Sequence, residues 1–195
     1  MDGTGFVATV KCYGLGLYKA LLRPLSLYRD IERGARYSSG LCVLVYGLIY
    51  VAASLWLYFN GFTPFFESWI RLPDDLYYLV QSAYILPLIL SMWILATGIL
   101  HGMSRLFHGR GRVEVLFRMT GYSLWAPWYI LIVFDCLHSI PEILYNGVLV
   151  LCMVLMIAGT AAATRIEEKI GLLASILSTL TAFAVITVIT LTYIR

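Results

Sequence analysis

The histidines are the side chains whose type is best suited to hold a metal ion. His101 and His108 are seven residues apart, about two turns of a helix, and neither a cysteine nor a carboxylate lies between them. His138 follows the next long apolar segment, so a membrane would separate it from the other two. Because a zinc site needs three or four ligands around one point, we expect neither a metal nor another cofactor.

Nucleophilic catalysis is also not favoured by the pattern of residues. The hydroxyl side chains of residues 170–194 have no histidine or acid near them in the sequence, and in a membrane such groups usually bond their own backbone or a neighbouring helix. The loop Gly109–Arg110–Gly111–Arg112 lacks the Lys-Ser/Thr ending of a phosphate-binding loop. We therefore expect no enzyme activity.

Arg118 and Asp135 are the candidates for intramembrane charges. The sixteen uncharged residues between them make about 24 Å of helix, which is shorter than a hydrocarbon core of about 30 Å. At least one of the two charges should therefore lie near a membrane boundary. Such a group is a candidate for an ion or substrate path. In the alternative, Glu114 pairs with Arg118 one turn later and Asp135 marks the end of its helix.

The composition places all these residues in an integral membrane protein. Of the 195 residues, 61% are hydrophobic and 13% are charged, against about 45–50% and about 25% in soluble domains. The mean hydropathy is +0.83. These values exclude a soluble enzyme, a disordered chain and a nucleic-acid-binding domain. A net charge of +3 is too small to indicate a nucleic-acid partner.

Five apolar stretches define the expected fold, an all-α membrane bundle. A helix of about 20 residues crosses a hydrocarbon core of about 30 Å. We expect a cytoplasmic segment over residues 1–37, with a short amphipathic interfacial helix, followed by a membrane domain over residues 38–195. Its five transmembrane helices are expected at about 40–59, 76–100, 113–134, 143–164 and 170–194.

The distribution of basic residues predicts the orientation in the membrane. Twelve of the fourteen Lys and Arg residues fall in residues 1–37, 101–118 and 165–169, and the other side has only Arg71 and Arg195. Under the positive-inside rule, the N-terminus is cytoplasmic and the C-terminus outside. We expect no cleavable signal peptide, because the first ten residues carry no basic run and the first long apolar stretch begins near residue 38.

A basic amphipathic helix is expected before the first span, within residues 17–34. Its apolar stripe is Leu17, Leu21, Leu25 and Tyr28, which recur at three- and four-residue intervals. Pro24 suits the first turn of a helix that runs to about Glu32, and anionic lipid attracts basic side chains. In the alternative, this segment only anchors the entry to the first span. The residues expected to bind anionic lipid or a protein partner are Arg23, Arg29, Arg33, Arg110 and Arg112.

Three segments in this order resemble a known family. They are RPLSLYRDI at 23–31, the Gly- and Arg-rich HGMSRLFHGRGRVEVLF at 101–117, and GYSLWAP at 121–127. From about residue 20, nearly the whole chain is similar in order and topology to the Yip1-domain membrane proteins, in particular their small archaeal and bacterial members.

The resemblance assigns four residues to the family pattern. Pro24 resembles the proline that opens the helix before the first span, and Gly121, Tyr122 and Pro127 resemble the glycine-tyrosine-proline pattern of the third span. One more residue separates Tyr122 from Pro127 than in the eukaryotic members, which bind prenylated Rab-type GTPases. The resemblance implies a five-span bundle with an inside N-terminus, no enzyme activity and a prokaryotic plasma membrane.

Two functions remain open at this point. The first is a non-enzymatic membrane scaffold or adaptor, as a single chain or a homo-oligomer, whose basic cytoplasmic face binds anionic lipid or a protein. The second is a small transporter, channel or substrate-binding membrane component with a path between spans two and three. These spans contain Pro87 and Pro127, and the second also carries the polar Gln81 and Ser82.

Overall fold

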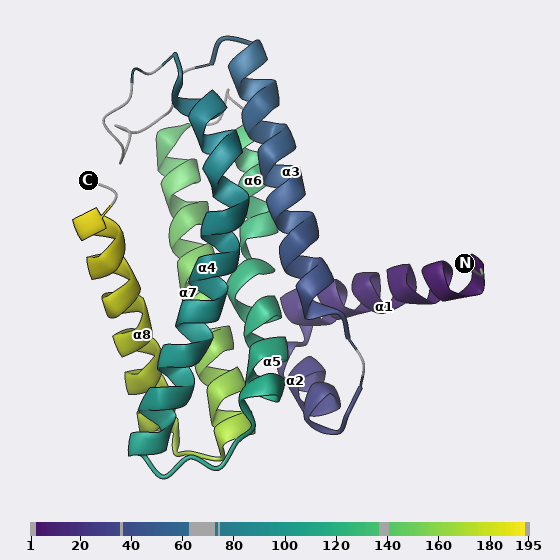
Figure 1. Ribbon diagram of the computed structural model, residues 1–195, viewed down its shortest axis with the longest axis vertical. Coiled ribbons are helices and arrows are strands. Elements are labelled where there is room, and N and C mark those ends of the chain that lie inside the picture. The colour runs from purple at the N-terminus through teal and green to yellow at the C-terminus, as the bar shows by residue number, and fades with distance from the viewer. Residues whose placement is uncertain (1–2, 36, 63–72, 74, 137–140, 194–195) are drawn as a thin grey trace.

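The computed structural model describes residues 3–35, 37–62, 73, 75–136 and 141–193, without the side chains of 3–10, 135 and 190–193. Within these residues the chain forms helices and no strand, and the long helices lie side by side in one bundle (Figure 1). The helices are α1 (Gly3–Leu22), α2 (Pro24–Glu32), α3 (Ser39–Phe59), α4 (Tyr77–Leu106), α5 (Val113–Trp125), α6 (Trp128–Cys136), α7 (Glu142–Glu168) and α8 (Leu172–Tyr193).

Four helices in the described part of the chain are long and apolar enough to cross a membrane: α3, α4, α7 and α8. They correspond to the expected first, second, fourth and fifth spans. Only between 22% and 33% of the most apolar stretch of each helix is buried inside the protein. Large apolar side chains such as Leu48, Ile94 and Val188 are therefore exposed, as expected for helices that face lipid.

The expected third span consists of two shorter helices, α5 and α6. They follow one another along the bundle (Figure 1), where α5 packs on α3, α4 and α7, and α6 packs on α3 and α7. Neither reaches the length of a spanning helix by itself. The interruption falls at Pro127, which has no backbone N–H to donate and whose ring clashes with the preceding turn. The Cys152 thiol of α7 donates to the Pro127 carbonyl at 3.3 Å, so a neighbouring helix covers the interruption.

The N-terminal region forms two helices. α2 begins with Pro24 at its first position and ends at Glu32, as the sequence predicts. α1 was not expected as a separate helix, and it projects sideways from one end of the bundle (Figure 1). The expected apolar stripe crosses the break at Arg23, so its helical spacing does not hold. Tyr28 is buried whereas Leu25 is 53% exposed.

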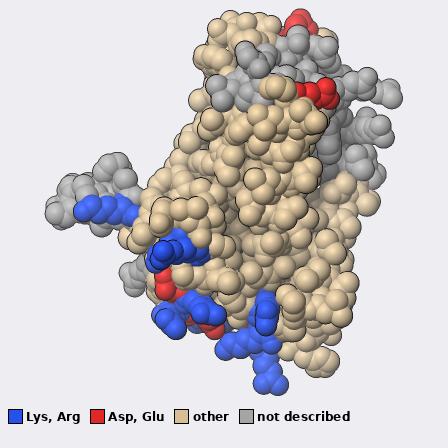
Figure 2. Space-filling view, turned by 180° about the vertical axis from the view of Figure 1, so that it is seen from behind, with Lys and Arg blue, Asp and Glu red and all other residues tan. Residues whose placement is uncertain are grey.

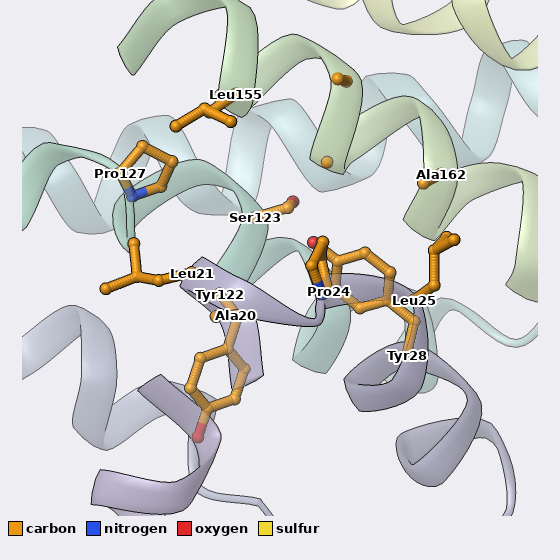
Figure 3. Close-up of a pocket in the computed structure, with 12 residues that line it drawn as sticks. Ala20, Leu21, Pro24, Leu25, Tyr28, Tyr122, Ser123, Pro127, Leu155 and Ala162 are labelled. Carbon is orange, nitrogen blue, oxygen red and sulfur yellow. The ribbon is translucent and has the colours of Figure 1, made fainter. Parts of the chain in front are cut away.

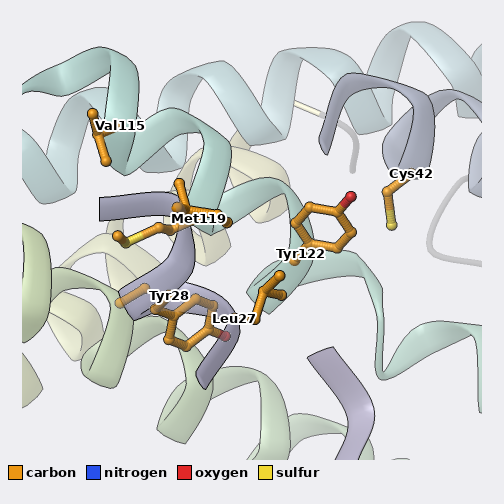
Figure 4. Packing of buried hydrophobic residues seen from close by; sticks show 8 residues of the cluster. Leu27, Tyr28, Cys42, Val115, Met119 and Tyr122 are labelled. Carbon is orange, nitrogen blue, oxygen red and sulfur yellow. The ribbon is translucent and has the colours of Figure 1, made fainter. Parts of the chain in front are cut away.

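A buried cluster fixes α2 against the bundle (Figure 4). Leu27 and Tyr28 of α2 pack with Cys42 of α3 and with Met119 and Tyr122 of α5, and all five are at most 1% exposed. α2 also packs on α7. The buried face of α2 therefore holds its other face, which carries the arginines, at one end of the bundle.

Candidate functional site

A cavity of about 240 Å³ lies where α2 meets α5 and α7 (Figure 3). Three of the four residues of the family pattern, Pro24, Tyr122 and Pro127, line this cavity. The sequence separates Pro24 from Tyr122 by almost a hundred residues. Only the packing of α2 against α5 brings them together.

The fourth residue of the pattern, Gly121, does not line the cavity but allows α5 to approach α3 and α4. A Cβ at this position would lie 2.9 Å from the Cβ of Ser39 and 2.9 Å from the indole of Trp93. Tyr122 is fully buried, and within the described part of the chain its hydroxyl has no hydrogen-bond partner. A Cβ on Gly16 of α1 would lie 2.6 Å from that hydroxyl oxygen. The pattern therefore serves close packing around the cavity.

Small residues of α7 form the opposite wall of the cavity. Ala158, Gly159 and Ala162 line it together with Leu155. This wall was not predicted from the sequence. The signal was present as a run of small residues, AGTAAA at 158–163, because such a run leaves room beside a helix that larger side chains would fill.

Three residues that line the cavity carry hydroxyl groups. The hydroxyl of Tyr122 lies beside Gly16 of α1, and the other two are hydrogen-bonded. Tyr28 and Ser123 are hydrogen-bonded to each other, and Ser123 also pairs with Thr160 at 3.0 Å. Burial raises the pKa of Tyr28 well above its usual value, because the phenolate would lose its hydration. The walls therefore offer mainly apolar surface to whatever occupies the cavity.

A basic groove of about 590 Å³ adjoins this cavity. Arg23, Arg29 and Arg33 line the groove and are exposed. Pro24 and Leu25 line both the groove and the cavity. Within the described residues, no ion pair joins the three guanidinium groups to a carboxylate. The groove is therefore electropositive where it meets the apolar cavity.

The one carboxylate that lines the groove, Asp30, is paired with a cation from α1. Lys19 Nζ donates to Asp30 at 2.7 Å and to the Tyr37 hydroxyl at 2.9 Å. The hydrogen bond to Asp30, followed by the one to Tyr37, raises the pKa of Lys19 above its usual value. Asp30 therefore does not cancel the charge of the arginines.

Arg110 and Arg112 do not line the groove; they lie in the loop between α4 and α5. Their side chains are exposed, while their backbone N–H groups bond the end of α7. Arg110 N donates to the Glu168 carbonyl at 3.1 Å, and Arg112 N donates to Glu167 Oε1 at 2.7 Å. Figure 2 shows Lys and Arg side chains gathered at the end of the bundle from which α1 projects, with some acidic side chains among them.

Glu168 holds this loop in place. It is fully buried, accepts a hydrogen bond from Gly111 N at 3.0 Å, and contacts His101 Nδ1 at 2.5 Å. Arg105 donates to the carbonyls of Gly109 and Gly111 at 3.1 and 2.9 Å. This role of Glu167 and Glu168 was not predicted from the sequence. Its signal was two carboxylates at a helix C-terminus, where the helix dipole disfavours negative charge unless donors compensate it.

The loop glycines are required by close contacts. A Cβ on Gly109 would lie 2.8 Å from Glu168 Oε2, and a Cβ on Gly111 would lie 2.7 Å from the Glu167 carbonyl oxygen.

The histidines do not form a metal site among the described residues. His101 contacts Glu168, while His108 is exposed in the loop between α4 and α5. His138 lies outside the described residues. Within those that are described, no three His, Cys, Asp or Glu side chains gather as a metal site requires.

The two intramembrane charge candidates are not brought together. Arg118 is exposed on α5, and no ion pair joins it to Glu114 within the described part of the chain. Asp135 belongs to α6, towards the other end of the bundle, and its side chain lies outside the described residues. The geometry therefore gives no support to a charged path that uses both residues.

The contact between α4 and α5, where the alternative transport function would place its path, is filled by side chains. Trp93 stacks on Phe117 with ring centroids 3.9 Å apart, and its indole N–H donates to Thr120 Oγ1 at 3.2 Å. Leu100 and Leu116 are fully buried beside them. Gln81 faces α3 instead, where it accepts a hydrogen bond from Ser54 at 3.1 Å. Ser82 donates to the Leu79 carbonyl of its own helix.

Comparisons with known proteins give one match. A family model described as the Yip1 domain matches residues 18–190, which include α2, both parts of the interrupted third segment and the walls of the cavity. No curated protein and no solved structure matches the chain.

Proposed function

The chain belongs to the Yip1 domain family, and from this premise we propose that it is a non-enzymatic membrane scaffold or adaptor. Its working surface is the basic face, which we define as Arg23, Arg29, Arg33, Arg110 and Arg112. This face binds anionic lipid or a protein partner on the cytoplasmic side. The family and the apolar helices make the chain a multi-pass membrane protein.

The observation that carries the proposal is the exposure of all five arginines at one end of the bundle. No carboxylate is ion-paired with any of them within the described residues. A basic side chain near an anionic membrane surface contributes about 1 kcal/mol to binding. Five such groups therefore supply a substantial attraction without any catalytic group.

The proposed topology has five crossings, with α5 and α6 together forming the third. The basic connections then lie on the cytoplasmic side of a prokaryotic plasma membrane, and the C-terminus lies outside. In this arrangement α1 projects sideways at the level of the cytoplasmic surface, where an interfacial helix would lie.

The test is crosslinking in native membranes, followed by affinity capture and mass spectrometry. The variant R29Q/R33Q/R110Q/R112Q should lose the captured partner or anionic lipid by about tenfold or more. The control R118Q/R165Q, which changes exposed arginines outside the basic face, should retain it. Undiminished capture by the quadruple variant, or recovery of the chain only as its own oligomer without bound anionic lipid, would overturn the proposal.

A further inference from the structure

We propose that the cavity and the groove form one binding site for an anionic phospholipid of the cytoplasmic leaflet. The phosphate lies between Arg23, Arg29 and Arg33, and one acyl chain enters the cavity between α2, α5 and α7. This inference rests on the proposed function, because it assigns a ligand to part of the basic face.

The two halves of the site are continuous. Pro24 and Leu25 line both the groove and the cavity, so one turn of α2 separates a charged surface from an apolar one. Figure 3 shows Pro24, Leu25 and Tyr28 of α2 on one side of the cavity and Ala162 of α7 on the other. A phospholipid has the same order of parts, a phosphate followed by an apolar chain.

The depth of the cavity matches an acyl chain of one leaflet. Ala162 lies six residues before the end of α7 and Leu155 thirteen residues before it, which correspond to about 9 and about 20 Å along the helix. The half-thickness of a hydrocarbon core is about 15 Å. Counted from the end of α7, the cavity therefore begins within one leaflet and reaches the depth of the midplane, which lies at about 15 Å.

The size and walls of the cavity suit part of a hydrocarbon chain. Its volume of about 240 Å³ lies just below the range of about 300–1,000 Å³ that small-molecule sites occupy. The hydroxyls of Tyr28 and Ser123 are hydrogen-bonded to each other, and the hydroxyl of Tyr122 lies beside Gly16 of α1, so the walls offer mainly apolar surface. Ala158 and Leu155 are exposed, so a chain can enter sideways from the bilayer.

The charge of the groove suits a phosphate. Guanidinium groups bind phosphate oxygens through two parallel hydrogen bonds, and the three arginines of the groove have no ion pair within the described residues. Asp30 is neutralised by Lys19 at 2.7 Å. An anionic lipid is therefore preferred over a zwitterionic one, whose headgroup adds a positive charge.

The first experiment measures lipid binding to the delipidated full-length chain by native mass spectrometry. The probes are phosphatidylglycerol, phosphatidylcholine and glycerol phosphate, a headgroup without acyl chains. We expect phosphatidylglycerol to bind at least about fivefold more tightly than phosphatidylcholine, and glycerol phosphate not to displace it. Equal binding of the two lipids, or displacement by glycerol phosphate, would overturn the inference.

Matched variants separate the two halves of the site. A158F fills the cavity from its open side and should weaken phosphatidylglycerol binding by about tenfold, equivalent to ~1.4 kcal/mol. Its control A52F places the same side chain on the exposed face of α3 and should change binding less than about twofold. R23Q/R29Q/R33Q should weaken binding and abolish the preference for phosphatidylglycerol, whereas R118Q/R165Q should not.

The outcomes distinguish the inference from the proposed function. Equal lipid binding by A158F and A52F would overturn the inference alone, while the loss of capture by the quadruple arginine variant would still support the proposed function. Labelling the unmodified chain with phosphatidylglycerol that carries a diazirine in one acyl chain tests the site independently of how A158F folds. Label concentrated in residues 155–162 supports the inference, whereas label spread evenly over the lipid-facing helices shows bulk lipid only and overturns it.

Discussion

The close approach of α5 to α3 and α4 makes Gly121→Ala a sharp test of the packing. The new Cβ would lie 2.9 Å from the Ser39 Cβ and 2.9 Å from the Trp93 indole, where ordinary contacts begin near 3.4 Å. Neither neighbour can yield easily. Ser39 Cβ is attached directly to a backbone, and the indole N–H of Trp93 donates to the Phe117 carbonyl at 3.1 Å and to Thr120.

The expected loss follows from two opposing effects. Overpacking a filled core costs about 1–3 kcal/mol, and replacing glycine by alanine inside a helix returns at most about 1 kcal/mol. We therefore expect Gly121→Ala to lower the free energy of unfolding by about 1–2 kcal/mol. For a chain of this size, this corresponds to a fall in Tm of about 2–8 °C.

The assay is thermal or SDS-induced unfolding of the purified protein in mild detergent micelles, followed by tryptophan fluorescence. The matched control is Gly98→Ala in α4, because no heavy atom lies within 4 Å of its Cβ position. That variant should retain or slightly gain stability. If Gly121→Ala proved as stable as Gly98→Ala, the inferred close packing of α5 would be refuted.

Two further predictions concern buried polar groups. Glu168→Ala should lower the free energy of unfolding by about 1–3 kcal/mol, because Gly111 N loses its acceptor in a buried position. Glu168→Gln keeps an acceptor oxygen and should lower the free energy of unfolding clearly less in the same assay. Equal decreases for the two variants would contradict the role of Glu168 as an acceptor. Because burial raises the pKa of Tyr28, its contribution to stability is fully present below the usual tyrosine pKa of about 10 and is lost as the pH rises further. Tyr28→Phe should therefore show a shallower loss of stability between pH 10 and 11, and an unchanged slope would count against the burial argument.

The sequence determined those features that depend on local composition and on spacing along a single helix. Apolar stretches predicted α3, α4, α7 and α8, because the hydrocarbon core sets the length of a helix that crosses it. Pro24 predicted the start of α2, since proline suits the first turn of a helix. The hydroxyls of α8 were expected to bond their own backbone or a neighbouring helix, and Ser175, Ser178 and Thr179 donate to backbone carbonyls of the same helix region.

Other features could not be read from spacing along the chain. The break at Arg23 separates α1 from α2, so the apolar residues that were expected to lie on one face of a single helix belong to two helices. Proline tolerance depends on the surrounding helices: α4 continues through Pro87, whereas Pro127 ends α5. The role of Glu168 depends on a loop more than fifty residues earlier in the chain, because its carboxylate accepts a hydrogen bond from the Gly111 N–H group of that loop.

The sequence by itself therefore determined a helical membrane protein, because transfer free energies are nearly additive along the chain. It also predicted the family, through the resemblance of three segments, and an orientation, through the positions of the basic residues. Only the tertiary structure decided that Pro24, Tyr122 and Pro127 surround one cavity, and that three of the five candidate arginines adjoin it while Arg110 and Arg112 do not. The reason is physical: a cavity is space left between side chains of different helices, and its position depends on how those helices pack against one another.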